Sequence, residues 1–597
     1  MSPASRIAAL RTLLQERGAA ACIVPAADPH LSEYLPARWK TREWLSGFTG
    51  SAGTLVVTAG AAGLWTDSRY FEQAERELAG SGIVLMRQRV PHAPEHLAWL
   101  AARLPHGARV AVAPDMLSVA GERALREALA PGGIGLLAED LPAALWHDRP
   151  PLPDAPVRAH AQAYAGATRA QRLADLRGRM AAAGATHHLL SSLDDIAWLT
   201  LLRGRDVEYN PVFLAHLLVD AQRATLFVPP HKLDAQLAAA LATDGIALAD
   251  YAGIAAALAA LPAGARLLFD PARVAAATLA GLPARVLRIE AGNPSTAAKA
   301  RKSACEIEHW REVMVRDGAA LVRAFRQIDT RVRAGQRLTE LDVDDLVTGE
   351  RAREADFAGP SFATIAGYGA NAALPHYRAT PGRHATLAPR GLLLVDSGGQ
   401  YAGGTTDITR VWALGETTPQ EQEDFSRVLA GMIALSRARF PAGASGPQLD
   451  ALARAPLWAA GCDYGHGTGH GVGYFLNVHE GPQGIRPPLP GGALVPLEPG
   501  MVTSIEPGLY RPGRHGVRHE NLALTVEAGQ GEFGPFLAFE TLTLCPFDTR
   551  PLRAALLDAA AQAWLDAYHA RVRETLSPRL SGADREWLDA RCAPLAA

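Results

Sequence analysis

The sequence predicts a mixed α/β protein of several domains, with two α/β domains followed by a third domain that is rich in strands. Its 597 residues are too many for one hydrophobic core. Helical stretches alternate with short apolar strands in the first half of the chain, which is typical of α/β domains. After a long helix near residue 300, apolar strands dominate the remainder.

The composition is that of an ordinary globular protein, with 48% hydrophobic and 20% charged residues and a net charge of -2. A surface that binds nucleic acid or an anionic membrane would need a basic excess, so neither partner is expected. The five cysteines are odd in number and widely spaced, and no two form a CxxC pair. We therefore expect neither a disulfide framework nor a thiolate zinc site.

Two hydrophobic stretches could be mistaken for targeting or membrane segments. The first eighteen residues form an amphipathic pattern interrupted by Arg6 and Arg11, unlike the apolar core of a signal peptide. The longest apolar tract begins at Ala252 and is broken by Pro262 and Arg266, so it is too weak for a membrane span. These features and the reduced cysteines predict a cytoplasmic protein.

The first domain is predicted to span residues 1–155 and the second residues 156–295. A proline-rich run at residues 148–157 reads as the linker, because proline lacks a backbone donor and resists helix. The second domain looks like a degenerate copy of the first. The first domain has Trp44-Leu45 followed by Gly50. The second has Trp198-Leu199 followed by Gly204, at the same spacing. The alternative is two unrelated α/β units.

The third domain is predicted to span residues 296–597. It begins with an amphipathic helix over residues 302–328 and continues with four apolar strands, whose sequences are GLLLVDSG, DITRVWAL, MVTSIEP and ENLALTV. A helical extension, from about residue 545 onward, completes it.

Four carboxylates lie at the ends or starts of these strands, namely Asp396, Asp407, Glu506 and Glu520. Two strands joined by the glycine-rich turn SGGQYAGGTT would place both aspartates on one face of a hairpin. Burying four clustered carboxylates is very costly, whereas two divalent cations would cancel their charge. Taken singly, each acid is also compatible with a solvated turn.

Histidines change this balance. His466, His470 and His479 lie in the glycine-saturated segment 464–482, where glycine permits positive φ and close backbone approach. Such a segment cannot form a stable helix, so the spacing of His466 and His470 is not a helical metal pair. His376 is a fourth candidate. Carboxylate oxygens with one imidazole suit manganese(II), with cobalt(II), iron(II) and zinc as competitors.

These motifs resemble the pita-bread metallopeptidases, and specifically their three-domain aminopeptidase P branch. The resemblance extends over nearly the whole chain, from WLSGFTGSAGT and LWTDSRYF through LDDIAWLTLLRGRDVEYNPVF to LLVDSGGQYAGGTTDITR, GHGTGHGVGYFLNVHEGP and TSIEPGLY. It implies two creatinase-like α/β domains before a pita-bread catalytic domain. It also implies a homodimer, because related three-domain enzymes form dimers.

The resemblance assigns two divalent metal ions per chain to five ligands: Asp396, Asp407, His470, Glu506 and Glu520. Asp407 and Glu520 match the bridging pair, Asp396 completes the shell of one metal, and His470 with Glu506 completes that of the other. The family's catalytic positions fall on His376, His466, His479, Glu506 and Arg518. Substrate contacts are implied for His376, His479, Tyr510 and Arg518.

The implied reaction is hydrolysis of the bond between an N-terminal residue and a penultimate proline, by attack of a metal-bridged hydroxide. Glu506 is the expected proton shuttle, and the metals with His479 or His376 would stabilise the oxyanion. Two alternatives are a prolidase-like dipeptidase and a non-catalytic pita-bread binding module. The extra α/β domain argues against the first, and five intact ligand positions argue against the second.

Overall fold

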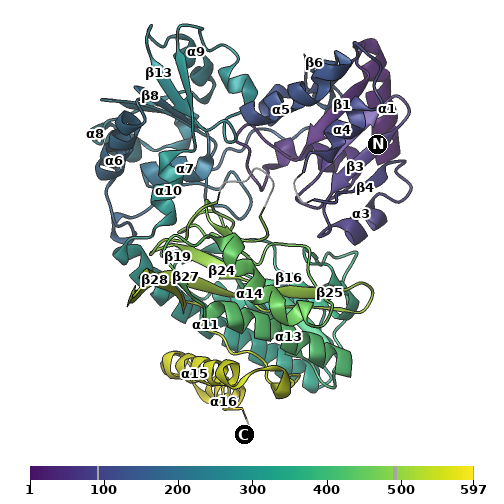
Figure 1. Ribbon diagram of the computed structural model, residues 1–597, viewed down its shortest axis with the longest axis vertical. Helices are drawn as coiled ribbons and strands as arrows, with labels where there is room; N and C mark the ends of the chain where they lie inside the picture. The colour runs from purple at the N-terminus through teal and green to yellow at the C-terminus, as the bar shows by residue number, and fades with distance from the viewer. Residues whose placement is uncertain (91–92, 489–493, 596–597) are drawn as a thin grey trace. The chain divides into compact units, whose positions relative to one another are not determined.

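The computed structural model describes residues 1–90, 93–488 and 494–595, and the chain divides into two compact units. The first unit comprises Met1–Gln162 and Ala167–Thr296, and the second comprises Ala163–Gly166 and Ala297–Ala597 (Figure 1). Within the described ranges, no helix is both long and apolar enough to cross a membrane. The domain boundaries near residues 155 and 295 stay predictions.

The first half of unit 1 is built on a six-stranded sheet in the order β4-β3-β2-β1-β5-β6. Its strands are β1 (Ala21–Pro25), β2 (Thr54–Thr58), β3 (Ala62–Thr66), β4 (Val84–Arg87), β5 (Arg109–Val112) and β6 (Gly135–Ala138). Strand β1 pairs antiparallel with β2 and parallel with β5. The helices are α1 (Pro3–Glu16), α2 (Thr41–Ser46), α3 (Phe71–Glu77), α4 (Glu95–Ala101) and α5 (Val119–Leu129).

Apolar side chains cover both faces of this sheet. Cys22 and Val24 of β1 belong to the same hydrophobic cluster as Leu10 of α1. Ile23, which points to the opposite face, belongs to a second cluster with Leu100 of α4. Successive strand residues alternate between faces, so a strand buried on both sides reads as a continuous apolar run.

The second half of unit 1 repeats this topology in a sheet of order β12-β11-β10-β8-β13-β14. Its strands are β8 (His187–Leu190), β10 (His216–Asp220), β11 (Ala224–Phe227), β12 (Ile246–Ala249), β13 (Arg266–Phe269) and β14 (Leu287–Glu290). The helices are α6 (Arg169–Ala182), α7 (Leu193–Thr200), α8 (Ala235–Thr243) and α9 (Ile254–Ala259), and β7 (Arg158–Ala159) pairs with β9 (Leu202–Arg203). Strand β8 pairs antiparallel with β10 and parallel with β13, as β1 does with β2 and β5. This agreement supports an internal copy.

A 30-residue helix, α11 (Ala304–Arg333), confirms the long helix predicted near residue 300. It begins at a capping box in which Ser303 and Glu306 satisfy each other's backbone N–H groups. Its buried face includes Trp310, Val313 and Leu321. The short α10 (Pro294–Ala300) precedes it and α12 (Glu340–Arg351) follows.

The four predicted strands are all present in unit 2. The structure has them as β17 (Leu392–Ser397), β20 (Ile408–Ala413), β24 (Val502–Ile505) and β27 (Asn521–Gly531). They belong to sheets of order β16-β17-β20 and β21-β28-β27-β24. The remaining strands are β15 (Phe357–Pro360), β16 (Ile365–Tyr368), β18 (Gly399–Tyr401), β19 (Gly404–Thr405), β21 (Arg439–Pro441), β22 (Gly469–His470), β23 (Gly484–Ile485), β25 (Gly508–Arg511), β26 (His515–Arg518) and β28 (Gly534–Thr541).

The connection between Asp396 and Asp407 is more than the predicted glycine-rich turn. Strands β17 and β20 do pair antiparallel, with Asp396 opposite Thr409. The residues between them form a second hairpin, β18–β19, in a separate sheet with β15. A Cβ at Gly398 would lie 2.0 Å from the Thr406 carbonyl oxygen, so this crossing requires glycine.

Among the described residues, the strand-dominated prediction missed three helices, α12, α13 (Pro419–Ser436) and α14 (Gly446–Trp458). Helix α13 starts at a capping box formed by Thr418 and Glu421, with proline at its first position. Phe425 and Leu429 on its buried face join the core of unit 2. The start of α13 could therefore have been predicted from Thr418, Pro419 and Glu421.

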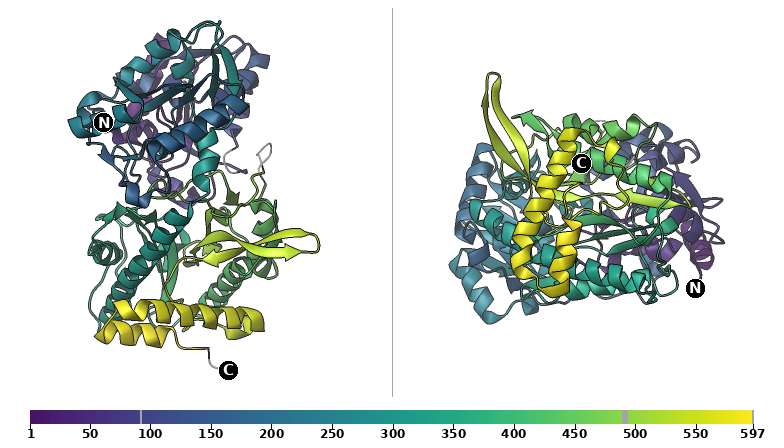
Figure 2. Two further views of the ribbon diagram at one scale, coloured as in Figure 1. Left: turned by 90° about the vertical axis from the view of Figure 1, so that its left-hand side faces the viewer. Right: turned by 90° about the horizontal axis from the view of Figure 1, so that it is seen from below.

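The C-terminal extension consists of two helices, α15 (Ala559–Leu576) and α16 (Gly582–Arg591). They lie side by side on unit 2, and Figure 2 shows them in yellow beneath it in one view and across it in the other. Leu565 and Leu588 share the hydrophobic cluster that contains α11 and α13 residues. The extension is thus part of the core of unit 2.

Stability is expected to fall as the pH falls from 6.5 to 4, because of His569 on α15. Burial, with the charge of Arg410, lowers the pKa of His569 from 6.5 to about 4. Its Nε2 accepts a hydrogen bond from the Phe547 N–H at 3.1 Å, so the native state needs the neutral ring. The unfolded chain binds the proton first as the pH falls, so this term is fully present above pH 6.5 and is lost toward pH 4, on the order of 3 kcal/mol.

Urea unfolding of the wild-type chain and of His569→Gln across this pH range measures the effect. Glutamine can still accept from the Phe547 N–H but does not titrate, so the variant should lose stability less steeply. Identical pH slopes for the two proteins would contradict the assignment.

Candidate metal centre and active site

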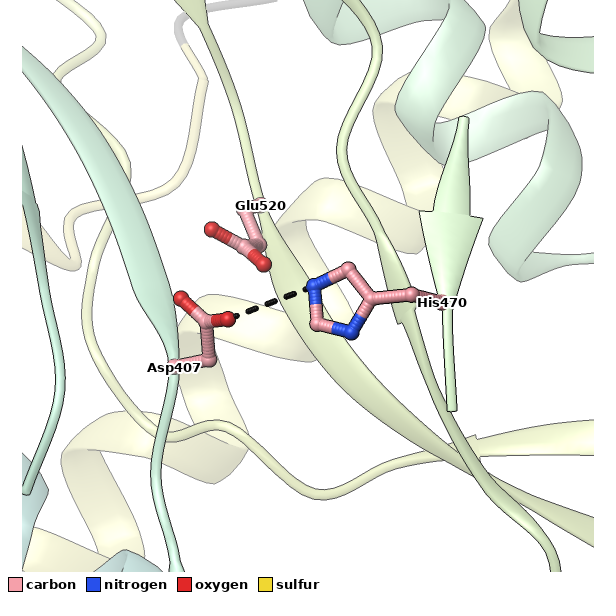
Figure 3. A group of neighbouring side chains, drawn as sticks. All are labelled: Asp407, His470 and Glu520. Atoms are coloured by element: carbon pink, nitrogen blue, oxygen red, sulfur yellow. Dashed lines mark ion pairs between the residues drawn. The ribbon is translucent and has the colours of Figure 1, made fainter. Parts of the chain in front are cut away.

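Three predicted metal ligands converge in unit 2 from separate elements. Asp407 immediately precedes β20, His470 ends β22 and Glu520 immediately precedes β27. One potential ligand atom from each lies within 4.8 Å of the other two. Figure 3 shows the three side chains pointing toward one another, with His470 Nε2 3.5 Å from Asp407 Oδ2.

Glu506 and Asp396 extend this cluster on two sides. Glu506 follows β24, and its Oε1 lies 3.2 Å from His470 Nε2. Asp396 lies in β17, and its Oδ2 accepts a hydrogen bond from Arg518 at 2.5 Å. The charges of Asp407 and Glu506 both raise the pKa of Asp396, so these acids share one electrostatic environment.

The His470 ring has the orientation expected of a metal ligand. Its Nδ1 lies 3.0 Å from the Gly471 carbonyl oxygen and can donate to it. That contact keeps Nδ1 as a donor and leaves Nε2 facing Asp407 and Glu506, where a cation could take the place of its proton. Burial lowers the pKa of His470, but the hydrogen bond to Asp407 and the charge of Glu506 outweigh it and raise the pKa to about 9.

The electrostatics of the cluster fit divalent cations. Burial raises the pKa of Asp396 to about 7 despite Arg518, and the charges of Asp407 and Glu506 add to the shift. Burial and the same neighbouring carboxylates raise the pKa of Glu520 well above its usual range. Asp396 Oδ1 and Glu520 Oε1 are buried and have no hydrogen-bond partner among the residues that the structure describes. Cations would partner these oxygens and relieve the repulsion.

Two residues that the sequence analysis missed orient the carboxylates. Thr409 donates from Oγ1 to Glu520 Oε2 at 2.8 Å. Ser504 donates from Oγ to Glu506 Oε1 at 3.0 Å and accepts from the His470 N–H. Each lies two positions from a ligand that directly flanks its strand, and strand alternation would have placed the two side chains on the same face.

Arg518, Tyr510 and His466 form a partly buried chain of hydrogen bonds next to Asp396. Arg518 donates to the Tyr510 hydroxyl at 2.6 Å and also to Asp396 and Thr409. The His466 Nδ1 lies 2.8 Å from the Gly467 carbonyl, so its Nε2 can accept from Tyr510 at 2.8 Å. Burial lowers the pKa of His466 to about 4, which keeps the ring neutral.

The two other predicted histidines lie beside this constellation. The His479 ring centroid is 4.3 Å from that of His470, and the two rings meet edge to face. His376 is partly exposed and follows Pro375, whose carbonyl oxygen accepts from Arg518 at 3.3 Å. The structure thus places the His479 ring against His470, and the residue before His376 in contact with Arg518.

The glycine-rich segment is irregular, as predicted, but for a different reason. None of Gly467, Gly469, Gly471 and Gly473, all within the described residues, has a positive φ, so that part of the prediction is wrong. A Cβ at Gly469 would lie 1.8 Å from the Ser504 carbonyl oxygen, and one at Gly471 would lie 2.2 Å from that of Glu480. Glycine is needed there for close backbone packing around His470.

Models of known families match most of the chain. Two matches describe a Creatinase/Prolidase N-terminal domain, over residues 6–137 and 148–306. Residues 308–527 match metallopeptidase family M24, and residues 535–595 match the C-terminal region of that family. "Aminopeptidase P2" of Arabidopsis thaliana is 39% identical, over 99% of this chain and 88% of its own length. The chain belongs to the aminopeptidase P branch of metallopeptidase family M24.

Other relatives extend this likeness to full length. A "Probable Xaa-Pro aminopeptidase P" of Sordaria macrospora is 37% identical over 99% of both chains. The crystal structure of an X-prolyl aminopeptidase from Caenorhabditis elegans, described as a cytosolic enzyme with a di-nuclear active site, superposes with a TM-score of 0.94 at 31% identity and covers 100% of both chains. These findings confirm the predicted fold class of two creatinase-like domains followed by a pita-bread domain.

Proposed function

We propose that this chain is a two-metal aminopeptidase that removes the N-terminal residue from peptides whose second residue is proline. The carrying observation is the convergence of Asp407, His470 and Glu520 within 4.8 Å in a chain that matches X-prolyl aminopeptidases over its full length. Full-length similarity favours this function over a dipeptidase, and the intact donor set favours it over a non-catalytic module.

Five residues would hold two divalent cations. Asp407 and Glu520 would bridge them, Asp396 would complete one shell, and His470 with Glu506 the other. The unpartnered oxygens of Asp396 and Glu520 support this assignment. When bound, the cations would supply a water of lowered pKa and a Lewis acid for the substrate carbonyl.

Glu506 would carry the proton from the attacking water to the leaving nitrogen. Its Oε1 is oriented by Ser504 and lies beside His470 Nε2. Burial raises the pKa of Glu506, but the charges of His470 and Arg518 outweigh burial and lower it, so Glu506 is a carboxylate that can accept a proton. His479 and His376 would stabilise the negative oxygen of the tetrahedral intermediate.

Arg518 acts in this proposal mainly by holding other residues. It is 3% exposed and donates to Asp396, Tyr510 and Thr409. A guanidinium that donates to three separate side chains orients Asp396 as a ligand and holds Tyr510 beside His466. Tyr510 and Arg518 would thereby shape the wall around the substrate's N-terminal residue.

Proline specificity would come from a pocket that does not depend on an N–H contact. The bond before proline is a tertiary amide, whose nitrogen carries a ring and no hydrogen. The imidazole faces of His376 and His479 could accept that ring beside the metals. The substrates are then peptides with proline at position two.

Three finer properties complete the proposal. Manganese(II) suits a site of four carboxylates and one imidazole. A cytoplasmic location fits five free cysteines and the cytosolic description of the Caenorhabditis elegans relative. A homodimer is proposed from the dimers of related three-domain enzymes.

Substrate length tests the proposal. The chain should cleave Ala-Pro-Ala at least as fast as Ala-Pro and should fail on acetyl-Ala-Pro-Ala, because an aminopeptidase recognises the free amino terminus and leaves the far side open. We would compare kcat/KM for the three peptides after loading the protein with MnCl2. A tenfold preference for the dipeptide, about 1.4 kcal/mol of transition-state binding, would favour a prolidase instead.

A further inference from the structure

Arg410, on β20 three residues after Asp407, is a buried cation with no role in the mechanism above. It is 1% exposed, and its guanidinium lies over the Phe547 ring, 3.9 Å from the centroid. Its hydrogen bonds in the described part of the chain go to uncharged groups: the carbonyl oxygens of Thr409, Glu520, Cys545 and Pro546, the side-chain oxygen of Asn521 and the hydroxyl of Tyr568. Burying a charge is costly, and these hydrogen bonds offset that cost. Because they leave in several directions, they also hold the guanidinium in one orientation.

One edge of the guanidinium holds the backbone of a proposed bridging ligand. Arg410 Nη1 donates to the Glu520 carbonyl oxygen at 2.6 Å, and Nη2 donates to the side chain of Asn521 at 2.8 Å. The preceding residue, Thr409, binds the Glu520 carboxylate and accepts from the Glu520 N–H at 3.2 Å. Two adjacent residues of β20, Thr409 and Arg410, therefore hold both the backbone and the carboxylate of Glu520.

The same guanidinium reaches the C-terminal helices. Arg410 Nη2 donates at 2.9 Å to the hydroxyl of Tyr568 on α15, 158 residues away in the chain. Tyr568 is 4% exposed, and its hydroxyl can donate to the carbonyl oxygens of Thr543 and Cys545. The guanidinium is planar and rigid, so it sets the position of Glu520 relative to α15.

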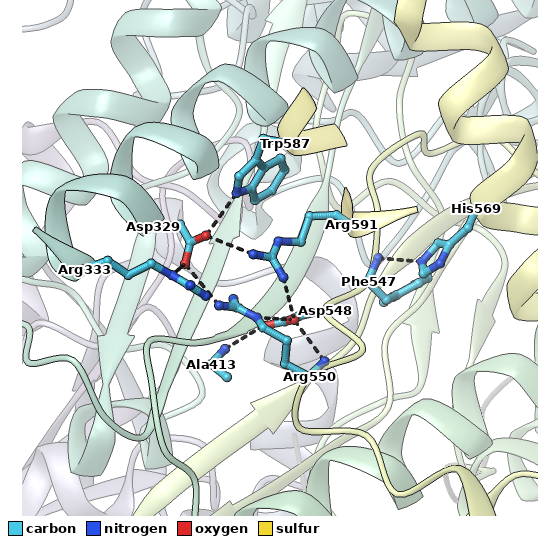
Figure 4. A network of polar contacts seen from close by, with 9 residues as sticks. All are labelled: Asp329, Arg333, Ala413, Phe547, Asp548, Arg550, His569, Trp587 and Arg591. Atoms are coloured by element: carbon cyan, nitrogen blue, oxygen red, sulfur yellow. Dashed lines mark hydrogen bonds and ion pairs between the residues drawn. The ribbon is translucent and has the colours of Figure 1, made fainter. Parts of the chain in front are cut away.

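The C-terminal segment is itself anchored to the scaffold of unit 2 (Figure 4). Asp548 accepts from the N–H of Ala413 at the end of β20, at 2.9 Å. Trp587 and Arg591 of α16 both donate to Asp329 on α11, each at 3.1 Å. The segment that carries the Tyr568 hydroxyl is therefore held in place by contacts with β20 and α11.

We propose that Tyr568 and Arg410 are positioning residues for the metal centre, through which the C-terminal helical segment sets the location of Glu520. Metal coordination tolerates displacements of only about 0.2 Å, so a small shift of the Glu520 backbone would weaken binding. This role rests on the metal site proposed above. It gives the C-terminal extension a function beyond stabilising the core.

Tyr568→Phe tests the proposal by deleting one hydroxyl while keeping the ring packed on Trp564 and Phe547. Full-length protein would be stripped with chelator and titrated with MnCl2 by calorimetry, and kcat and KM would then be measured on Arg-Pro-Pro. We expect Mn²⁺ affinity and kcat each to fall about tenfold, with KM nearly unchanged, as for other supporting residues of metal ligands. Arg410→Lys keeps the charge but loses the planar set of donors. It should lower Mn²⁺ affinity and kcat by more than Tyr568→Phe does.

Trp587→Phe is the control, because it removes one anchoring hydrogen bond of the same segment, leaves the bond from Arg591 to Asp329 in place and does not touch Arg410. It should lower Tm but leave Mn²⁺ affinity and kcat as in the wild-type chain. Wild-type affinity in Tyr568→Phe, or an equal loss of affinity in Trp587→Phe, would overturn the positioning role. Absence of Mn²⁺ binding in the wild-type chain would instead overturn the proposed metal site, and the positioning role with it.

Discussion

Asp407→Asn is expected to lose both metal ions and at least about a thousandfold in kcat/KM, about 4 kcal/mol of transition-state stabilisation. Asp407 contributes one of the three ligand atoms that lie within 4.8 Å of one another, and it is proposed to bridge the two ions. A neutral amide cannot compensate two positive charges, so neither ion would be held tightly. Elemental analysis of dialysed protein and hydrolysis of Arg-Pro-Pro measure the two effects.

Asp356→Asn is the matched control for this change. Asp356 forms an ion pair with Arg316 outside the proposed metal site. The Asp356→Asn protein should therefore still bind about two ions per chain. Loss of a single ion from Asp407→Asn would contradict the bridging assignment. Fully active wild-type protein with one ion or fewer would contradict the two-metal mechanism itself.

His479→Ala is expected to keep both ions but to lower kcat by a factor of about 10² to 10³. The His479 ring lies against that of His470, yet in the proposal it contacts substrate and not metal. His376→Ala should behave in the same way. Metal content and kcat, measured on the same preparations, separate binding of the ions from stabilisation of the oxyanion.

His470→Ala provides the comparison, because His470 is the proposed imidazole ligand. It should lose metal, whereas the two other alanine variants should not. Equal metal loss in all three variants would show that the division between ligand histidines and substrate histidines is wrong. A full complement of metal in His470→Ala would remove it from the ligand set.

Local sequence was sufficient for the elements that carry the site. The apolar strands beside Asp396, Asp407, Glu506 and Glu520 are all present, as is the long helix α11. Alternation, capping residues and turn chemistry act over a few residues, which is why they are legible in the chain. The missed helix α13 has the same kind of signal, a Thr418 cap followed by proline.

Other features depend on contacts between distant segments. The hairpin β18–β19 inside a supposed turn follows from its pairing with β15, which no local pattern specifies. The close approach of Gly469 to the Ser504 carbonyl likewise depends on how strands β22 and β24 pack. Register between strands is set by packing of whole faces, so it cannot be deduced from one strand.

The sequence by itself determined the family, the order of the three domains and the residue types that suit two divalent cations. Only the tertiary structure decided which groups orient those residues: Thr409 for Glu520, Ser504 for Glu506 and Arg518 for Asp396. It also decided that Tyr568 reaches Arg410 across 158 residues. Hydrogen bonds between segments far apart in the chain exist only once strand register and helix docking have fixed the distances, and no local propensity encodes them.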